Sequence, residues 1–453
     1  METQERSRML GTMEMGRLVP KVSIPIMISM MVQALYNVVD GIFVAKYSAA
    51  ALTAVSLAYP IQMLMIAVST GLGVGFNSLI SRKLGEKRAE EAREAAKNGL
   101  FTELCGYLLF LVFGLLFARP FFNLFTPDQE LRALGGEYLS IVCVFSFGLF
   151  FGICFERMMQ ATGNTVLSMA TQLTGAVINI ILDPIMIFGL LGFPAMGIAG
   201  AAIATVIGQI GGMTLGLVLN QAKNVELRLH LKGFRPDKTI LKGILDVGFP
   251  SIIMQSISSV MNVLMNMILL GFGATAVNVL GVYFKLQSFV FMPVFGLSNG
   301  LVAILGYNYG ARMRKRVYDA LKVALIWAAA IMLLGTVAFL LIPETLLSLF
   351  EAGDARDLTA MGVVALRVIS LSFLLAAVGI TISTLFQAVG KGFYSLLMSL
   401  CRQIIVLLPA AWLLSKTGSV DAVWWSFPIA ELFSLTLCLV LYRQVDKTML
   451  QKL

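Results

Sequence analysis

Apolar stretches long enough to cross a lipid bilayer follow one another along almost the whole chain. A membrane-spanning helix needs about 20 mainly apolar residues, and inside a bilayer only helices and closed barrels satisfy their backbone hydrogen bonds. Apolar residues make up 58% of the sequence and charged residues 13%, about half the charged fraction of a soluble protein. We therefore predict an all-α membrane protein with spans near residues 22–44, 53–80, 99–118, 134–155, 166–191, 197–219, 240–270, 276–305, 323–342, 359–386, 393–414 and 422–442.

Basic residues are distributed unevenly over the connections between these stretches. The two termini and alternate connections hold 26 lysines and arginines, whereas the connections on the opposite side hold five. Because basic loops stay on the cytoplasmic side, both termini are predicted to be cytoplasmic, which requires an even number of spans. Twelve spans meet this requirement. The basic residues behind the net charge of +9 are thus explained by the orientation of the chain in the membrane, and they do not indicate nucleic acid as a partner.

The second half of the sequence repeats the first. Residues that match at an offset of 225 include Pro25 and Pro250, Asn37 and Asn262, Gln62 and Gln287, and Gly71 and Gly296. After a two-residue insertion the matches continue, for example with Gly163 and Gly390. Each copy contains an even number of spans, so both copies enter the membrane from the same side and are related by an axis along the membrane normal.

These features predict twelve transmembrane helices in two pseudo-twofold-related six-helix bundles around a central cleft. The N-lobe comprises residues 1–221, a cytoplasmic linker follows at 222–239, and the C-lobe comprises residues 240–453. Two bundles around a cleft suit alternating access, in which one bundle rocks against the other. The architecture therefore indicates a transporter that spans the lipid bilayer.

Two acidic residues lie inside predicted spans of the N-lobe. Asp40 falls in the stretch 22–44, and Asp183 falls in the stretch 166–191. An acid at membrane depth is costly, faces protein or water, and by default marks an ion or proton site. We therefore treat both acids as candidates for a coupling site.

Polar residues accompany both acids at helical spacing. The first stripe consists of Gln33, Tyr36, Asn37 and Asp40, and the second of Gln172, Asn179 and Asp183. If the stripes face each other, the two carboxylates share a small volume and cannot both ionise cheaply. Such a pair suits one proton, or a sodium ion with further oxygens from Asn179 and Thr205. The alternative is that each acid only accepts internal hydrogen bonds.

The C-lobe lacks equivalents of the two acids, because Met265 and Ala410 occupy the matching positions. Its own charged residues are Lys285, Arg367, Arg402 and Glu431. We expect Lys285 or Arg402 to neutralise Glu431 in a buried structural pair, since charges inside a bundle usually pair with one another. The alternative is that Glu431 contacts a substrate or acts as a second coupling acid.

Three further residues are candidates for roles in helix movement and substrate contact. Pro25 and Pro184 favour kinks in the two helices that carry the acids, so they can couple ion binding to bending, or they only set a fixed shape. Met261 belongs to a group of methionines that we expect near the cleft, where flexible thioethers adapt to varied ligands or only fill gaps.

The sequence contains no Walker loop, no cysteine and histidine cluster suited to a metal, and no nucleophile–base constellation. His230, the single histidine, lies in the predicted linker and is interpreted as a solvated loop residue. We expect no enzymatic activity and no cofactor, and ATP-driven transport and membrane redox chemistry lose support.

A set of short segments, taken in order, carries a resemblance to a known family. The segments are Tyr36-Asn-Val-Val-Asp40-Gly-Ile-Phe-Val, Gln160-Ala-Thr-Gly163-Asn, Asn179-Ile-Ile-Leu-Asp183-Pro, Gly197-Ile-Ala-Gly-Ala-Ala, Gln287-Ser-Phe and Pro293-Val-Phe-Gly-Leu-Ser-Asn-Gly300. In these segments, and in its length and duplication, the chain resembles bacterial members of the multidrug and toxic compound extrusion (MATE) family.

The resemblance implies an exporter of small amphipathic, often cationic drugs and dyes in the bacterial cytoplasmic membrane, driven by inward H⁺ or Na⁺. It implies a cation-coupling site at Asp40, Asn179, Asp183 and Thr205. It indicates no obligate protein partner. From the stripes and the methionines we expect the substrate cleft to be lined by Gln33, Tyr36, Asn37, Gln172 and Met261.

Two other functions fit parts of the sequence. A flippase for lipid-linked saccharides has a similar duplicated architecture and would need a basic cleft, for which Lys285, Arg367 and Arg402 are available. An ion-conducting or sensory membrane protein without coupled export is the second alternative. The two acids in the N-lobe favour coupled export over both.

Overall fold

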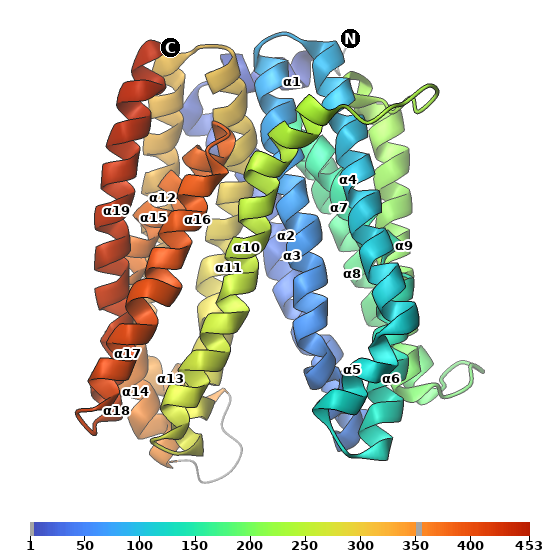
Figure 1. Ribbon diagram of the computed structural model, residues 1–453, viewed down its shortest axis with the longest axis vertical. Coiled ribbons are helices and arrows are strands. Elements are labelled where there is room, and N and C mark those ends of the chain that lie inside the picture. The colour runs from blue at the N-terminus through green and yellow to red at the C-terminus, as the bar shows by residue number, and fades with distance from the viewer. Residues whose placement is uncertain (1–3, 350–355) are drawn as a thin grey trace.

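The computed structural model describes residues 4–349 and 356–453, and every regular element in that part of the chain is a helix (Figure 1). Ten helices are long and apolar enough to cross a membrane, and two bent helix pairs bring the number of spans to 12. The prediction of twelve transmembrane helices is thereby confirmed for the described residues. Of the predicted lobes, residues 1–3 and 350–355 lie outside the described residues.

The first half of the chain forms helices α1 to α9. Their bounds are α1 (Gln4–Thr12), α2 (Met15–Tyr47), α3 (Ala49–Gly85), α4 (Ala89–Leu116), α5 (Ala118–Phe125), α6 (Gln129–Val144), α7 (Phe147–Ala161), α8 (Thr165–Phe188) and α9 (Gly197–Lys223). The connection to the second half contains η1 (Val225–Leu227).

The second half forms the remaining helices. Their bounds are α10 (Lys238–Leu270), α11 (Ala274–Gly310), α12 (Arg314–Leu341), α13 (Pro343–Ser348), α14 (Arg356–Ser370), α15 (Phe373–Ala388), α16 (Gly392–Leu400), the π-helix η2 (Cys401–Leu407), α17 (Leu408–Ser415), α18 (Val420–Trp424), α19 (Ser426–Thr448) and η3 (Leu450–Lys452). Several helices extend beyond the predicted apolar stretches, because hydropathy marks only the part in lipid while helical hydrogen bonding continues into the polar flanks.

The same span is bent in both halves of the chain. The axes of α6 and α7 differ by 42°, and those of α14 and α15 differ by 48°. At the first bend the hydroxyl of Ser146 donates to the carbonyl of Cys143 at 2.8 Å, and at the second the hydroxyl of Ser372 donates to the carbonyl of Ile369 at 2.6 Å. A serine that hydrogen-bonds a preceding carbonyl competes with the helical ladder and bends the helix.

The two bundles pack against each other through repeat-related contacts. A Cβ atom at Gly71 of α3 would lie 2.7 Å from the backbone nitrogen of Ile252 in α10. A Cβ atom at Gly296 of α11 would lie 2.6 Å from the Cα atom of Met27 in α2. The offset of 225 relates Gly71 to Gly296 and Met27 to Ile252, so one contact is the pseudo-twofold image of the other. Glycine at both positions allows the helix backbones to approach closely.

The contact between the bundles, which we call the inter-lobe seam, lies toward the end of the molecule that carries both termini. The hydroxyl of Ser78 in α3 donates to the carbonyl of Gln387 in α15 at 2.6 Å. The amide of Asn308 in α11 donates to the carbonyl of Leu10 in α1 at 2.8 Å. Toward the opposite end the two bundles diverge (Figure 1). One buried apolar cluster, which includes Phe150, lies within the first bundle, and another, which includes Trp424, joins helices of the second bundle to Leu18 and Val22 of α2.

Candidate functional site

The two acids of the N-lobe come together. The carboxyl groups of Asp40 on α2 and Asp183 on α8 lie close enough to interact directly, and the side chain of Asp183 has no exposed surface. Two ionised carboxylates are both acceptors, so they can share a hydrogen bond only when one of them carries a proton. Binding of one proton or an equivalent monovalent cation between α2 and α8 stays a prediction.

Asn179 and Thr205 complete the surroundings of Asp183. The amide nitrogen of Asn179 donates to Asp183 Oδ1 at 3.3 Å and lies 3.2 Å from the hydroxyl of Thr205 on α9. Turning the amide lets its nitrogen donate to Asp183 Oδ2 at 3.2 Å while its oxygen accepts from the hydroxyl and backbone N–H of Thr205. The second orientation satisfies donors and acceptors together, so we assign it. In this orientation the amide nitrogen faces the carboxylate and the amide oxygen is bound by Thr205, so the prediction that oxygens of Asn179 and Thr205 bind Na⁺ stays a prediction.

Close packing of α8 on α9 sets this geometry. A Cβ atom at Gly208 of α9 would lie 2.7 Å from the carbonyl oxygen of Gly175 and 3.1 Å from the Cβ atom of Asn179. A larger residue at position 208 would push the two helices apart. The glycine therefore keeps Thr205 within hydrogen-bonding reach of Asn179.

Two aromatic hydroxyl groups border the acid pair. Tyr36 and Tyr138 both lie close enough to interact electrostatically with Asp40 and Asp183. The hydroxyl of Tyr138, on α6, accepts a hydrogen bond from the side-chain amide of Gln62 at 2.9 Å. Sequence analysis included Tyr36 and missed Tyr138, because a single tyrosine in a mixed stretch has no periodic signal. The match of Gln62 with Gln287 in the repeat was the one available indication.

The residues predicted to line the substrate cleft do not form one group. Gln172 on α8 donates from its side-chain amide to the side-chain oxygen of Gln33 on α2 at 3.0 Å, which joins the two stripes. Asn37 is exposed. Met261 is buried in the C-lobe and lines a pocket there. The structure thus brings Gln33, Tyr36 and Gln172 to the α2–α8 interface and places Met261 elsewhere.

Both candidate prolines lie inside continuous helices. Pro25 is within α2, and Pro184 is within α8 next to Asp183. The hydroxyl of Ser29 donates to the carbonyl of Pro25 at 3.0 Å. A role for either proline in bending stays a prediction, since the bends recorded among the described spans lie in other helices.

Glu103 is a further buried acid that sequence analysis did not single out. Its side chain on α4 is fully buried and accepts a hydrogen bond from the hydroxyl of Ser69 at 2.9 Å. Arg157 on α7 is also buried, and its guanidinium donates to the side-chain oxygen of Gln160 at 3.0 Å. Arg157 lies within electrostatic range of both Glu103 and Glu156, so this part of the N-lobe contains one base and two acids.

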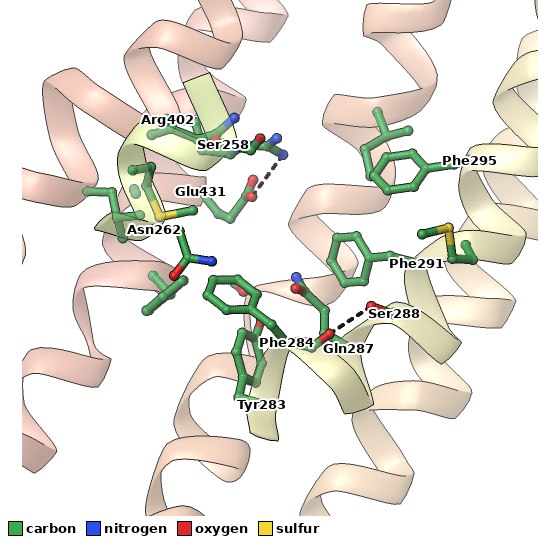
Figure 2. A pocket seen from close by; sticks show the side chains of 18 residues that line it. Ser258, Asn262, Tyr283, Phe284, Gln287, Ser288, Phe291, Phe295, Arg402 and Glu431 are labelled. Atoms are coloured by element: carbon green, nitrogen blue, oxygen red, sulfur yellow. Dashed lines mark hydrogen bonds and ion pairs between the residues drawn. The ribbon is translucent and has the colours of Figure 1, made fainter. Parts of the chain in front are cut away.

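The C-lobe contains a pocket of about 350 Å³ (Figure 2). It is lined by Ser258, Met261, Asn262, Tyr283, Phe284, Gln287, Ser288, Phe291, Met292, Phe295, Ser372, Ile380, Arg402, Gln403, Leu407, Phe427, Ala430 and Glu431. Figure 2 shows Arg402 and Glu431 on one side of the pocket, with Phe291 and Phe295 on the other. The wall therefore contains five aromatic side chains and one ion pair.

Arg402 is the partner of Glu431. Its Nη1 atom donates to Glu431 Oε1 at 3.2 Å. Lys285, the other basic residue considered for this pair, is exposed and is not among the pocket-lining residues. Every other ion pair among residues 4–349 and 356–453 lies at the α3–α4 connection or in the first turns of α4. In the part of the chain that the structure describes, no group of three or more His, Cys, Asp or Glu side chains could hold a metal ion.

Comparison with known proteins places these features in a family context. The family model MatE matches residues 25–185 and again residues 250–413. The multidrug export protein MepA of Staphylococcus haemolyticus (strain JCSC1435) is 27% identical over 410 residues, which cover 90% of this chain and 89% of that protein.

Two solved structures are similar over the whole chain. The first is described as the outward-facing conformation of a multidrug resistance MATE family transporter of the MOP superfamily. It has a TM-score of 0.92, 26% identity and 100% coverage of both chains. The second is a MOP superfamily transporter from Pyrococcus furiosus Vc1 (DSM3638), described as having a binding pocket of reverse polarity that suggests a different function. It also has a TM-score of 0.92 and 26% identity, and covers 97% of this chain and 98% of its own.

Proposed function

Since this chain belongs to the MatE family of transporters, we propose that it is a cation-coupled antiporter of the bacterial cytoplasmic membrane. It exports amphipathic, often cationic drugs and dyes in exchange for H⁺ or Na⁺ by alternating access. The observation that carries this proposal is the contact between the carboxyl groups of Asp40 and Asp183.

The acid pair supplies the coupling. Among the described residues, no basic side chain forms a hydrogen bond or an ion pair with Asp40 or Asp183. Full ionisation of both acids would therefore leave two neighbouring negative charges in a buried place, which is costly. Binding of one H⁺ or Na⁺ removes one of these charges and favours the contact of α2 with α8. Release of the ion restores the negative charge, which attracts a cationic drug.

The structure corresponds to one end of the transport cycle. The bundles are joined along the inter-lobe seam near the termini and diverge toward the opposite end. With both termini in the cytoplasm, this state is open to the outside. The opposite state requires the seam to separate, which breaks the hydrogen bond of Ser78 to Gln387 and the glycine contacts of α3 with α10.

The flippase alternative has less support from the charges of the C-lobe. A pyrophosphate head group would need basic side chains that converge on one surface. Arg402 is the only residue of the three candidates that lines the C-lobe pocket, and Glu431 is its partner. Arg367 is exposed on α14, where it donates to the carbonyl of Leu340 at 3.3 Å. These positions favour export of drugs over transport of lipid-linked saccharides.

The experiment is transport into liposomes that contain the purified protein. Uptake of ethidium is followed under an imposed pH gradient and, separately, under an imposed Na⁺ gradient. Wild type is compared with Asp183→Asn and with Asp421→Asn, a matched change at an exposed acid outside the site. We expect one gradient to drive uptake, Asp183→Asn to abolish it and Asp421→Asn to retain it. Unchanged gradient-driven uptake in Asp183→Asn would remove the acid pair from the mechanism.

A further inference from the structure

We propose that the C-lobe pocket is a separate binding site for amphiphiles that combine an aromatic body with a carboxylate. Arg402 is the residue that receives the carboxylate. This inference goes beyond cation-coupled export, because binding at the pocket requires neither an ion gradient nor the acid pair of the N-lobe.

The shape and walls of the pocket fit a small aromatic body. Its volume of about 350 Å³ is within the range of small-molecule sites, roughly 300–1,000 Å³. Phe284, Phe291 and Phe295 of α11 contribute aromatic rings, and Asn262 and Gln287 contribute amides among them (Figure 2). An apolar wall with a few convergent polar groups is typical of a binding site rather than of a packing defect.

The ion pair at the pocket wall is asymmetric. The side chain of Arg402 is 30% exposed, whereas that of Glu431 is 12% exposed. A guanidinium has five N–H donors in a planar fork, and a single hydrogen bond, to Glu431, is recorded for Arg402 among the described residues. The remaining donors are available to a ligand. Because carboxylates match the guanidinium fork, the more accessible member of the pair selects an anionic group.

The backbone next to this pocket contains a π-helix. Arg402 and Gln403 belong to the π-helix η2, which interrupts the span formed by α16 and α17. Such π-turns are uncommon and often occur at functional sites. Here two consecutive side chains, those of Arg402 and Gln403, line the same pocket.

Gln403 supplies an independent indication of a ligand. Its side chain is 6% exposed, and its amide nitrogen donates to the hydroxyl of Ser399 at 2.9 Å. Its side-chain oxygen has no hydrogen-bond donor within the described part of the chain. A buried acceptor without a donor costs free energy, and a ligand N–H or O–H group in the pocket would supply one.

The position of the tryptophans allows binding here to be measured directly. All four tryptophans, Trp327, Trp412, Trp424 and Trp425, lie in the C-lobe. Energy transfer from tryptophan to a dansyl group therefore reports on a ligand in this lobe. Dansylglycine carries a carboxylate, and dansylglycinamide is its neutral counterpart of nearly equal size. Both are titrated into the full-length protein in nanodiscs, without any ion gradient.

Wild type is expected to bind dansylglycine about tenfold or more tightly than dansylglycinamide. One charge-assisted hydrogen bond between the carboxylate and Arg402 accounts for a difference in affinity of this size. Arg402→Gln removes this preference. Glu431→Gln frees the guanidinium from its competitor and is expected to tighten dansylglycine binding several-fold. A variant that fails to fold would bind dansylglycine more weakly. Weaker binding by Arg402→Gln together with tighter binding by Glu431→Gln therefore shows recognition of the carboxylate and not structural damage.

Arg367→Gln is the matched control, because it makes the same chemical change in the same lobe at an exposed arginine outside the pocket. It is expected to leave both affinities unchanged. Asp183→Asn is expected to retain dansylglycine binding while it loses gradient-driven exchange, so this site and the proposed antiport can fail separately. Equal binding of the two probes by wild type, or equal weakening by Arg402→Gln and Glu431→Gln, would overturn the proposal.

Discussion

The buried acids of this protein differ in what surrounds each carboxyl group. Glu431 lies 3.2 Å from Arg402 and forms a pair that is neutral as a whole. Asp183 has the amide of Asn179 and a second acid, Asp40, as its neighbours. A matched pair keeps its charge through a transport cycle, whereas two acids in contact must gain or lose a cation when their separation changes. We therefore propose the N-lobe acids, and not Glu431, as the coupling site.

Glu226 provides a prediction outside the membrane. It lies in η1, where the hydroxyl of Ser7 donates to its side chain, and burial raises its pKa above the ordinary value of 4.5. The folded state thus holds the proton more tightly than the unfolded state, so stability is full below pH 4.5 and falls as the pH rises through the folded pKa. The protection factors of the amides of residues 7–12, which are corrected for the intrinsic pH dependence of hydrogen exchange, are expected to fall as the pH rises above 4.5. Glu226→Gln should remove this pH dependence, and a persisting dependence would contradict the assignment.

Single residues were predictable where their chemistry contrasts with the local sequence. Asp40 and Asp183 stand in apolar stretches and were identified as candidates, and the structure brings their carboxyl groups together. Tyr138 and Glu103 were not identified. A tyrosine in a mixed stretch and a glutamate near the edge of the predicted apolar stretch 99–118 lack this contrast, although both side chains are buried.

At the scale of helices, the order and position of the spans followed from hydropathy, but their shape did not. The bends at Ser146 and Ser372 arise from single hydroxyl–carbonyl hydrogen bonds, which a hydropathy average does not detect. The π-helix η2 also has no hydropathy signal, although it places Arg402 and Gln403 in the C-lobe pocket. The local features that shape the binding surfaces are therefore the ones that sequence periodicity leaves undetermined.

The continuous helix α2 leads to a prediction about Pro25. Proline lacks the N–H that would complete a helical hydrogen bond, which lowers the cost of bending at this position. Pro25→Ala restores the donor, so we expect gradient-driven ethidium exchange to slow by about tenfold, as a barrier higher by about 1.4 kcal/mol would cause. Ion affinity should stay unchanged. Pro60→Ala, at the proline inside α3, is the control; equal slowing in both variants would argue against a specific role for Pro25.

At the scale of the whole molecule, the two bundles are related by the sequence repeat, but the two acids Asp40 and Asp183 occur in the first bundle alone. The contact of Gly71 with Ile252 is repeated by that of Gly296 with Met27, as the offset of 225 predicts. The position equivalent to Asp40 is occupied by Met265, which is fully buried. The duplication and the one-sided acids were therefore predictable from the sequence. The position of the inter-lobe seam was not, because it depends on how the two bundles pack, which the repeat pattern does not determine.

The inter-lobe seam provides a prediction about stability. A methyl group at Gly296 would lie 2.6 Å from the Cα atom of Met27, so the backbones of α2 and α11 would have to separate. Gly296→Ala is expected to destabilise this state by about 1–3 kcal/mol, as overpacking does. Thermal unfolding of the detergent-solubilised protein measures the effect. Gly281→Ala, on the same helix with no atom within 4 Å of the added Cβ, is the control, and equal stability of the two variants would contradict the described seam.

The central claim is that an ion and a drug exclude each other through the Asp40–Asp183 pair. The measurement that tests it most directly is the ethidium affinity of the purified protein as a function of pH and, separately, of Na⁺ concentration. We expect the dissociation constant of wild type to rise with the concentration of one of the two ions, as linkage requires, and that of Asp183→Asn to stay constant. An affinity independent of both ions in wild type, or the same ion dependence in Asp183→Asn, would contradict the account.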